Sequence, residues 1–96
     1  MSDSTLPALR EAVTAELRDL YAKALDYTVE EVTPDADLEA DLGVDSLRQV
    51  ELMDRVLCHY GLGQLAEHVH ASHYPRIADI ADLVVRLREE PHPAAG

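Results

Sequence analysis

The sequence is poor in residue types that mark particular classes of protein. Its 96 residues include one cysteine, Cys58, and no phenylalanine or tryptophan. A single cysteine excludes an internal disulfide and fits a reducing cytosol. No run of about 18 apolar residues is present, which argues against a transmembrane helix, and the first residues give no expectation of a secretory signal. Without phenylalanine and tryptophan, the core must consist of Leu, Val, Ile, Ala, Met and four tyrosines.

Basic residues are also scarce. The chain has 8 Lys and Arg against 19 Asp and Glu, for a formal net charge of −11. Such a surface repels nucleic-acid phosphates and anionic lipid, so neither nucleic acid nor membrane is expected as a partner. It favours basic protein partners, because oppositely charged surfaces associate faster. The apolar share of 47% and the length indicate one small folded domain.

Two segments near the ends show clear helical spacing. Between residues 5 and 25, apolar side chains recur in steps of three and four, which predicts an amphipathic helix with Ser4 or Thr5 as its N-cap. A last helix is expected after Pro75. The expected core-facing residues are Leu6, Leu9, Val13, Leu17, Leu20, Tyr21 and Ala24 in the first helix, and Ile77, Ile80, Ala81, Val84 and Leu87 in the last.

A further helix is predicted over residues 46–60, with Asp45 as its N-cap and Gly61 at its end. The spacing places one stripe toward the core and the polar residues mostly on the other side. The stripe is Leu47, Val50, Met53, Val56 or Leu57, and Tyr60; the polar set is Arg48, Gln49, Glu51, Asp54 and Arg55.

The remaining segments complete an all-α prediction. Residues 26–45 are expected to form a long loop, with Gly43 at a positive φ angle, and residues 64–72 a short third helix. The predicted fold is a four-helix bundle of three longer helices and this short one. The domain is expected at residues 5–89, with an N-terminal tail at 1–4 and a flexible C-terminal tail at 90–96.

Ser46 is the side chain with the most suggestive position. Gly43 turns the chain, Asp45 caps the helix, and Ser46 is then the first helical residue, with Leu42 and Leu47 expected to point inward. A phosphate ester on Ser46 would face unpaired backbone N–H groups and the positive end of the helix dipole. Asp41 and Asp45 oppose that attraction, so an external enzyme would have to place a phosphate there.

The residues around Ser46 read Asp41-Leu42-Gly43-Val44-Asp45-Ser46-Leu47, followed by Val50-Glu51-Leu52. This motif resembles that of acyl carrier proteins, in the phosphopantetheine-binding carrier family. The resemblance implies that Ser46 bears 4′-phosphopantetheine, transferred from coenzyme A by a magnesium-dependent phosphopantetheinyl transferase. It implies a carrier that holds acyl groups as thioesters, with no catalytic residue and no metal site of its own.

The resemblance also implies a surface on which partner enzymes dock. Transferred to this sequence, that surface comprises Asp45, Leu47, Val50, Glu51 and Asp54. The implied partners are the phosphopantetheinyl transferase and acyltransferase, ketosynthase or acyl-ligase type enzymes with basic patches. The protein itself is expected to be a cytoplasmic monomer. The charge pattern supports this independently, because residues 26–54 hold ten acidic residues and one basic residue.

Differences from the family pattern, together with the composition, indicate which biosynthetic pathway the protein serves. Arg48 stands where primary fatty-acid carriers usually have an acid, and Arg55 adds a second base to the helix. One lysine against seven arginines suggests a GC-rich genome such as that of an actinobacterium. Together these favour polyketide or related specialised biosynthesis. A primary fatty-acid carrier, a peptidyl or aryl carrier and an acidic non-carrier binding module stay open as alternatives.

Other chemistries find less support. The acids from Asp35 to Asp41 alternate like a calcium loop, but the sixth and twelfth positions are Ala40 and Ser46 rather than Gly and Glu. No nucleophile elbow surrounds Ser46. The histidines at 68, 70 and 73 are expected on the surface, Cys58 is expected to be packed, and the four tyrosines are expected at the core edge with hydrated hydroxyls.

Overall fold

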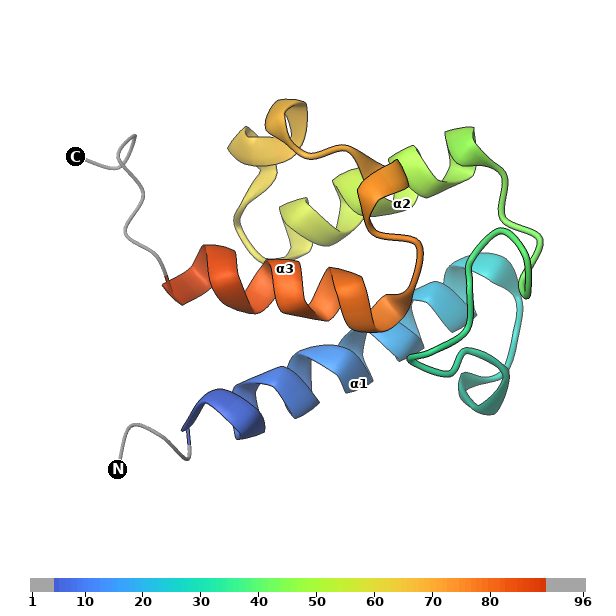
Figure 1. The fold of residues 1–96 in the computed structure, drawn as a ribbon, viewed down its shortest axis with the longest axis horizontal. Helices are drawn as coiled ribbons and strands as arrows, with labels where there is room; N and C mark the ends of the chain where they lie inside the picture. Colours follow the sequence, from blue (N-terminus) through green and yellow to red (C-terminus); the bar gives the residue numbers. More distant parts are fainter. Residues whose placement is uncertain (1–4, 90–96) are drawn as a thin grey trace.

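The computed structural model describes residues 5–89, and the tails predicted at 1–4 and 90–96 lie outside the described residues. Three α-helices dominate it: α1 (Thr5–Leu25), α2 (Ser46–His59) and α3 (Ile77–Glu89). Three short 3-10 helices lie in the connections: η2 (Val29–Glu31), η3 (Gly63–His68) and η4 (Ala71–His73). No strand occurs between residues 5 and 89. The all-α prediction is therefore confirmed (Figure 1).

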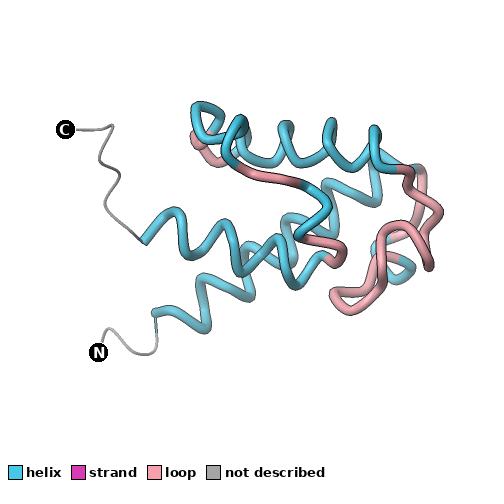
Figure 2. The backbone as a smooth tube through the Cα atoms, turned by 45° about the horizontal axis from the view of Figure 1, so that its top comes forward, coloured by secondary structure: helices cyan, strands magenta, loops and turns pink. Residues whose placement is uncertain are grey.

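The helices form a small bundle with the long loop at one end. α1 packs against α3, and α2 packs against η3 and η4 (Figure 1). The loop of residues 26–45 lies at the end of the bundle where α1 stops and α2 starts (Figure 2). The predicted third helix is present as two 3-10 helices, separated by Val69 and His70 in extended conformations.

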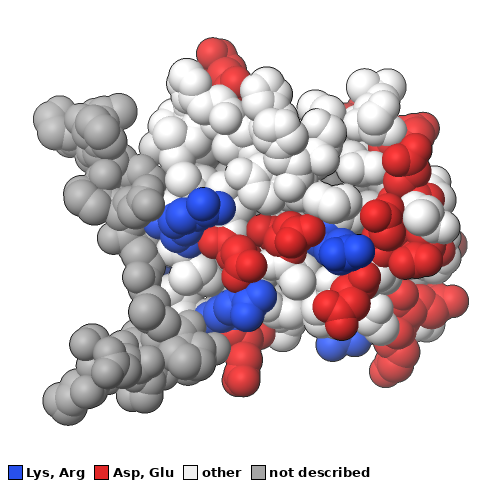
Figure 3. Space-filling model, in the orientation of Figure 1, with Lys and Arg blue, Asp and Glu red and all other residues white. Residues whose placement is uncertain are grey.

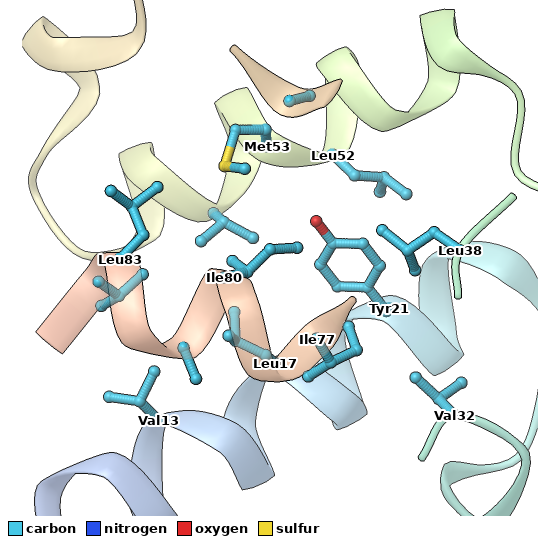
Figure 4. Packing of buried hydrophobic residues seen from close by; sticks show 14 of the residues in the cluster. Val13, Leu17, Tyr21, Val32, Leu38, Leu52, Met53, Ile77, Ile80 and Leu83 are labelled. Atoms are coloured by element: carbon cyan, nitrogen blue, oxygen red, sulfur yellow. The ribbon is translucent and has the colours of Figure 1, made fainter. Parts of the chain in front are cut away.

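The predicted core faces of α1 and α3 are confirmed, except that the side chain of Leu6 lies outside the described residues. Val13, Leu17 and Tyr21 of α1 are each at most 2% exposed, and they face buried residues of α3 (Figure 4). The buried side chains of α3 are Ile77, Ile80, Ala81, Leu83 and Val84. Hydrophobic burial between these two helices therefore stabilises the base on which the rest of the bundle packs.

The predicted core face of α2 is confirmed at Met53, Val56 and Leu57, and it is wrong at Leu47 and Val50. Leu47 and Val50 are 70% and 55% exposed, although the spacing placed them inward. The buried face is Gln49, Leu52, Met53, Val56 and Leu57. Both stripes have helical spacing and share Met53 and Val56 or Leu57, but the buried one has Gln49 and Leu52 in place of Leu47 and Val50. This orientation of α2 leaves two apolar side chains in solvent.

The long loop is held in place by buried side chains and by hydrogen bonds to α1 and to the segment before α3. Its buried residues are Val32, Leu38, Leu42 and Val44. The Arg18 guanidinium of α1 donates to the carbonyls of Val29 and Val32 at 2.9 and 2.8 Å. The Leu38 N–H donates to the Pro75 carbonyl at 2.8 Å, just before α3. These contacts give a loop without regular structure one defined path.

Tyr21 departs from the expectation of a hydrated hydroxyl. Its side chain is completely buried, and its hydroxyl points toward α2 in the core (Figure 4). The hydroxyl has no hydrogen-bond partner among the described residues, and burial raises the pKa of Tyr21. A buried polar group without a partner is destabilising.

We therefore expect Tyr21→Phe to stabilise the domain by about 1–3 kcal/mol, because it removes the unpaired hydroxyl and keeps the ring. Urea denaturation measures the change. Tyr27→Phe is the matched control, since the Tyr27 hydroxyl donates to the Leu42 carbonyl at 2.9 Å. It should lower the free energy of unfolding by about 1 kcal/mol. Destabilisation of both variants would contradict the role assigned to Tyr21.

Candidate functional site

Ser46 is the first residue of α2, and its side chain is exposed. The backbone before it is fixed, because Leu42 and Val44 are buried and the Val44 N–H donates to the Leu38 carbonyl at 2.8 Å. Gly43 adopts the predicted positive φ, of 71°, which side chains rarely tolerate. The predicted inward orientation of Leu42 is confirmed, and that of Leu47 is not. Ser46 is thus displayed in solvent from a well-anchored turn.

Asp45 is the N-cap of α2, as predicted. Its backbone is extended, and its carboxylate accepts a hydrogen bond from the Arg48 N–H at 2.8 Å. This bond satisfies one of the free N–H groups of the first turn and favours a helix start at Ser46. The positive end of the helix dipole also lies here, within reach of a group carried by Ser46.

Gln49 is a site residue that the sequence interpretation placed on the wrong side. It is 8% exposed, and its side-chain amide donates to the Val44 carbonyl at 3.0 Å. This bond ties the first turn of α2 to the segment that leads into Ser46. The signal was its spacing of three and four residues from Leu52 and Met53, which puts Gln49 in the buried stripe.

Arg48 holds α2 to the end of α1. Its guanidinium donates to the Ala24 carbonyl, in the last turn of α1, at 2.8 Å. The side chain lines a cleft with Ala24, Tyr27 and Asp45. A cation at a helix C-terminus meets the negative end of the dipole. Arg48, the base found where primary fatty-acid carriers usually have an acid, therefore links the first turn of α2 to the end of α1.

A cleft of about 470 Å³ opens beside Ser46. Its walls come from the loop, the start of α2 and the segment around η4: Asp37, Glu39, Ser46, Gln49, Val50, Val69, His70, Ala71, Ser72 and Pro75. A second cleft, of about 220 Å³, shares Val50, Val69 and Ala71 with it and is also lined by Met53, Ala66, Glu51 and Asp54. Ser46 thus lines one of two clefts that share three residues of their walls.

The five residues expected to dock partners lie on the exposed side of α2 or at its cap. Asp45, Glu51 and Asp54 are exposed, as are Leu47 and Val50 between them. Acidic residues gather at the end of the molecule that holds the long loop and the start of α2 (Figure 3). The fold therefore places apolar side chains in an acidic rim next to Ser46.

The rival chemistries receive no support from the loop. The Asp37 carboxylate accepts from the N–H groups of Glu39 and Ala40 at 2.9 and 2.8 Å, and that of Asp41 accepts from the Asp37 N–H at 2.8 Å. These acids stabilise a turn rather than converge on a cation. Within residues 5–89, no group of three or more His, Cys, Asp or Glu is arranged to hold a metal.

Two smaller predictions concern Cys58 and the three histidines. Cys58 was expected to be packed, and that is wrong, because its side chain is exposed on α2. His68, His70 and His73 are exposed, as expected. No helix in the described part of the chain has the length and apolar character to cross a bilayer.

Comparison with known proteins agrees with the site. Residues 15–84 match the family model described as phosphopantetheine attachment site. The chain is 45% identical over 67 residues to the polyketide-8 synthase acyl carrier protein 2 of Streptomyces avermitilis, covering 70% of this chain and 72% of that protein. It is 59% identical over 39 residues to an acyl carrier protein of Streptomyces coelicolor, covering 40% and 42% of the two chains. No solved structure matches. The chain therefore belongs to the acyl carrier proteins, the family that carries a phosphopantetheine attachment site.

Proposed function

We propose that Ser46 is the attachment point for 4′-phosphopantetheine, and that the chain serves polyketide or related specialised biosynthesis. An acyl carrier protein carries acyl intermediates without catalysing their chemistry, so it acts by meeting synthase or acyl-transfer enzymes. The observation that supports Ser46 is its exposed hydroxyl at the anchored start of α2, beside a cleft with room for a bound group.

The residues present fit the group. When attached, phosphopantetheine supplies a thiol at the end of a flexible arm, which keeps an acyl thioester at high effective concentration near an enzyme. Gly43, Asp45 and Gln49 hold the turn and the first helical residues, so that the Ser46 hydroxyl reaches a transferase in a constant orientation. The chain itself thus positions the Ser46 hydroxyl and presents the attached arm to partner enzymes.

The test is the intact mass of the protein after incubation with a phosphopantetheinyl transferase, magnesium and coenzyme A. The proposal expects a gain equal to one phosphopantetheine group, located on the peptide that contains Ser46. An unchanged mass would favour the alternative of an acidic binding module that kept the bundle without the arm.

We further propose that Asp45, Leu47, Val50, Glu51 and Asp54 form the docking surface. Leu47 and Val50 offer apolar contact area, and the three acids around them suit a partner with a basic rim. The transferase and acyltransferase, ketosynthase or acyl-ligase type enzymes are the partners proposed for it. Domain boundaries of 5–89, a monomeric state and a cytoplasmic location complete the proposal, the last supported by the single cysteine.

Glu51→Arg and Asp54→Arg are each expected to slow acyl loading by a partner enzyme about 10-fold at low salt, because they replace an attractive charge with a repulsive one. Both residues are exposed, so the fold should persist, as circular dichroism can show. Glu11→Arg, an exposed acid on α1, is the matched control and should load at the normal rate. Equal slowing by Glu11→Arg would contradict a defined surface on α2.

The pathway proposal is supported by the relative from Streptomyces avermitilis, which is named as a polyketide synthase carrier. A carrier of primary fatty-acid synthesis is the alternative, and a peptidyl or aryl carrier would share the fold. Mass spectrometry of the protein isolated from its own host would identify the acyl group that it carries. A chain that keeps oxygens from more than one extension step supports the polyketide proposal, and saturated chains alone would contradict it.

A further inference from the structure

The cleft beside Ser46 has an uneven distribution of charge. Asp37 and Glu39 are its acidic lining residues, and His70 is the basic one. A phosphodiester on Ser46 carries one negative charge, which the two acids repel. His70 is therefore the lining side chain that can supply an opposite charge to this group.

Two other basic residues, Arg48 and Arg76, lie near Ser46 but are not among the residues that line this cleft. The Arg48 guanidinium donates to the Ala24 carbonyl and lines a different cleft, with Tyr27 and Asp45. Arg76 pairs through its backbone with Asp37, and it is not among the residues that line the cleft. Neither arginine replaces His70 as a cationic partner inside the cleft.

The position of His70 is supported by its neighbours. It precedes η4, and its carbonyl accepts a hydrogen bond from the His73 N–H at 2.9 Å. The His73 ring meets the His70 ring edge-on, with 5.5 Å between their centroids. His70 is exposed and is one of the residues that line the cleft.

We propose that His70 binds the phosphodiester carried by Ser46 and does so in a pH-dependent way. This inference rests on the proposed function. A protonated imidazole at His70 attracts the phosphodiester into the cleft, whereas a neutral imidazole leaves only the repulsion from Asp37 and Glu39. The other titratable groups around it are His73, beside its ring, and Asp45, next to Ser46.

The experiment is phosphorus NMR of the loaded protein as a function of pH. A phosphodiester does not itself titrate near neutrality, so a step in its chemical shift between about pH 5 and 8 reports a titrating neighbour. We expect this step in the wild-type protein and in His68→Gln, a histidine on η3 that does not line the cleft. His70→Gln should remove the step. High salt should weaken it, because salt screens exposed charges.

The outcomes separate this inference from the proposed function. A gain of one phosphopantetheine group with no step in the wild-type protein would overturn the role of His70 and leave the carrier function standing. A step that persists in His70→Gln would do the same. No gain in mass would overturn the proposed attachment at Ser46, and the inference about His70 with it.

Discussion

Ser46→Ala is expected to abolish the gain of phosphopantetheine completely and to leave the fold intact. The substitution removes the oxygen to which the group attaches. The side chain is exposed, and no hydrogen bond in the described residues uses its hydroxyl, so the free energy of unfolding should change by less than about 0.5 kcal/mol. Intact mass after incubation with the transferase, magnesium and coenzyme A measures loading, and urea denaturation measures stability.

Ser72→Ala is the matched control, because Ser72 is an exposed serine that lines the same cleft. It should load as the wild-type protein does. A mass gain that survives in Ser46→Ala, or an equal loss in Ser72→Ala, would show that the attachment point is not the serine at the start of α2. The pair thus tests one position while the cleft and the chemistry of the substitution stay the same.

The start of α2 could be predicted because its determinants are local. A glycine at positive φ, a capping aspartate and the first helical serine lie within four residues, and each acts on the backbone beside it. The sequence interpretation placed Gly43, Asp45 and Ser46 where the structure has them. Local geometry of this kind depends little on which helix packs against which.

The face that α2 buries could not be predicted in the same way. One stripe runs through Leu47 and Val50 and the other through Gln49 and Leu52, and both repeat with helical spacing. The choice depends on packing against η3 and η4, segments that follow in the sequence and whose 3-10 geometry has no clear periodic signal. The hydrogen bond from Gln49 to Val44 then makes a polar residue acceptable inside.

The cleft beside Ser46 could not be predicted from the sequence, for a related reason. Its walls join residues more than twenty positions apart, from Asp37 and Ser46 to His70. The sequence indicated surface histidines between residues 64 and 74, but it contained no information on which of them reaches the start of α2. Only the path of the chain through the break after η3 brings His70 to Ser46 and leaves His68 away from it.

Leu38→Ala is expected to lower the free energy of unfolding by about 2–5 kcal/mol, because the side chain is 1% exposed and its removal leaves a cavity. The loss would be a large part of the total of about 5–15 kcal/mol typical of a domain. Leu38 also connects the long loop to the turn before Ser46 through backbone hydrogen bonds. Its N–H donates to the Pro75 carbonyl, and its carbonyl accepts from the Val44 N–H, so the anchor of the loop is also the anchor of the turn before Ser46.

Leu47→Ala is the matched control, with the same loss of atoms from a leucine that is 70% exposed. Its free energy of unfolding should stay within about 0.5 kcal/mol of the wild-type value, as urea denaturation can measure. The two leucines should also differ in function. Leu47→Ala should slow loading by partner enzymes while the domain stays folded, because Leu47 belongs to the proposed docking surface. Equal destabilisation by both substitutions would contradict the orientation of α2, since only a buried Leu47 would leave a cavity of that kind.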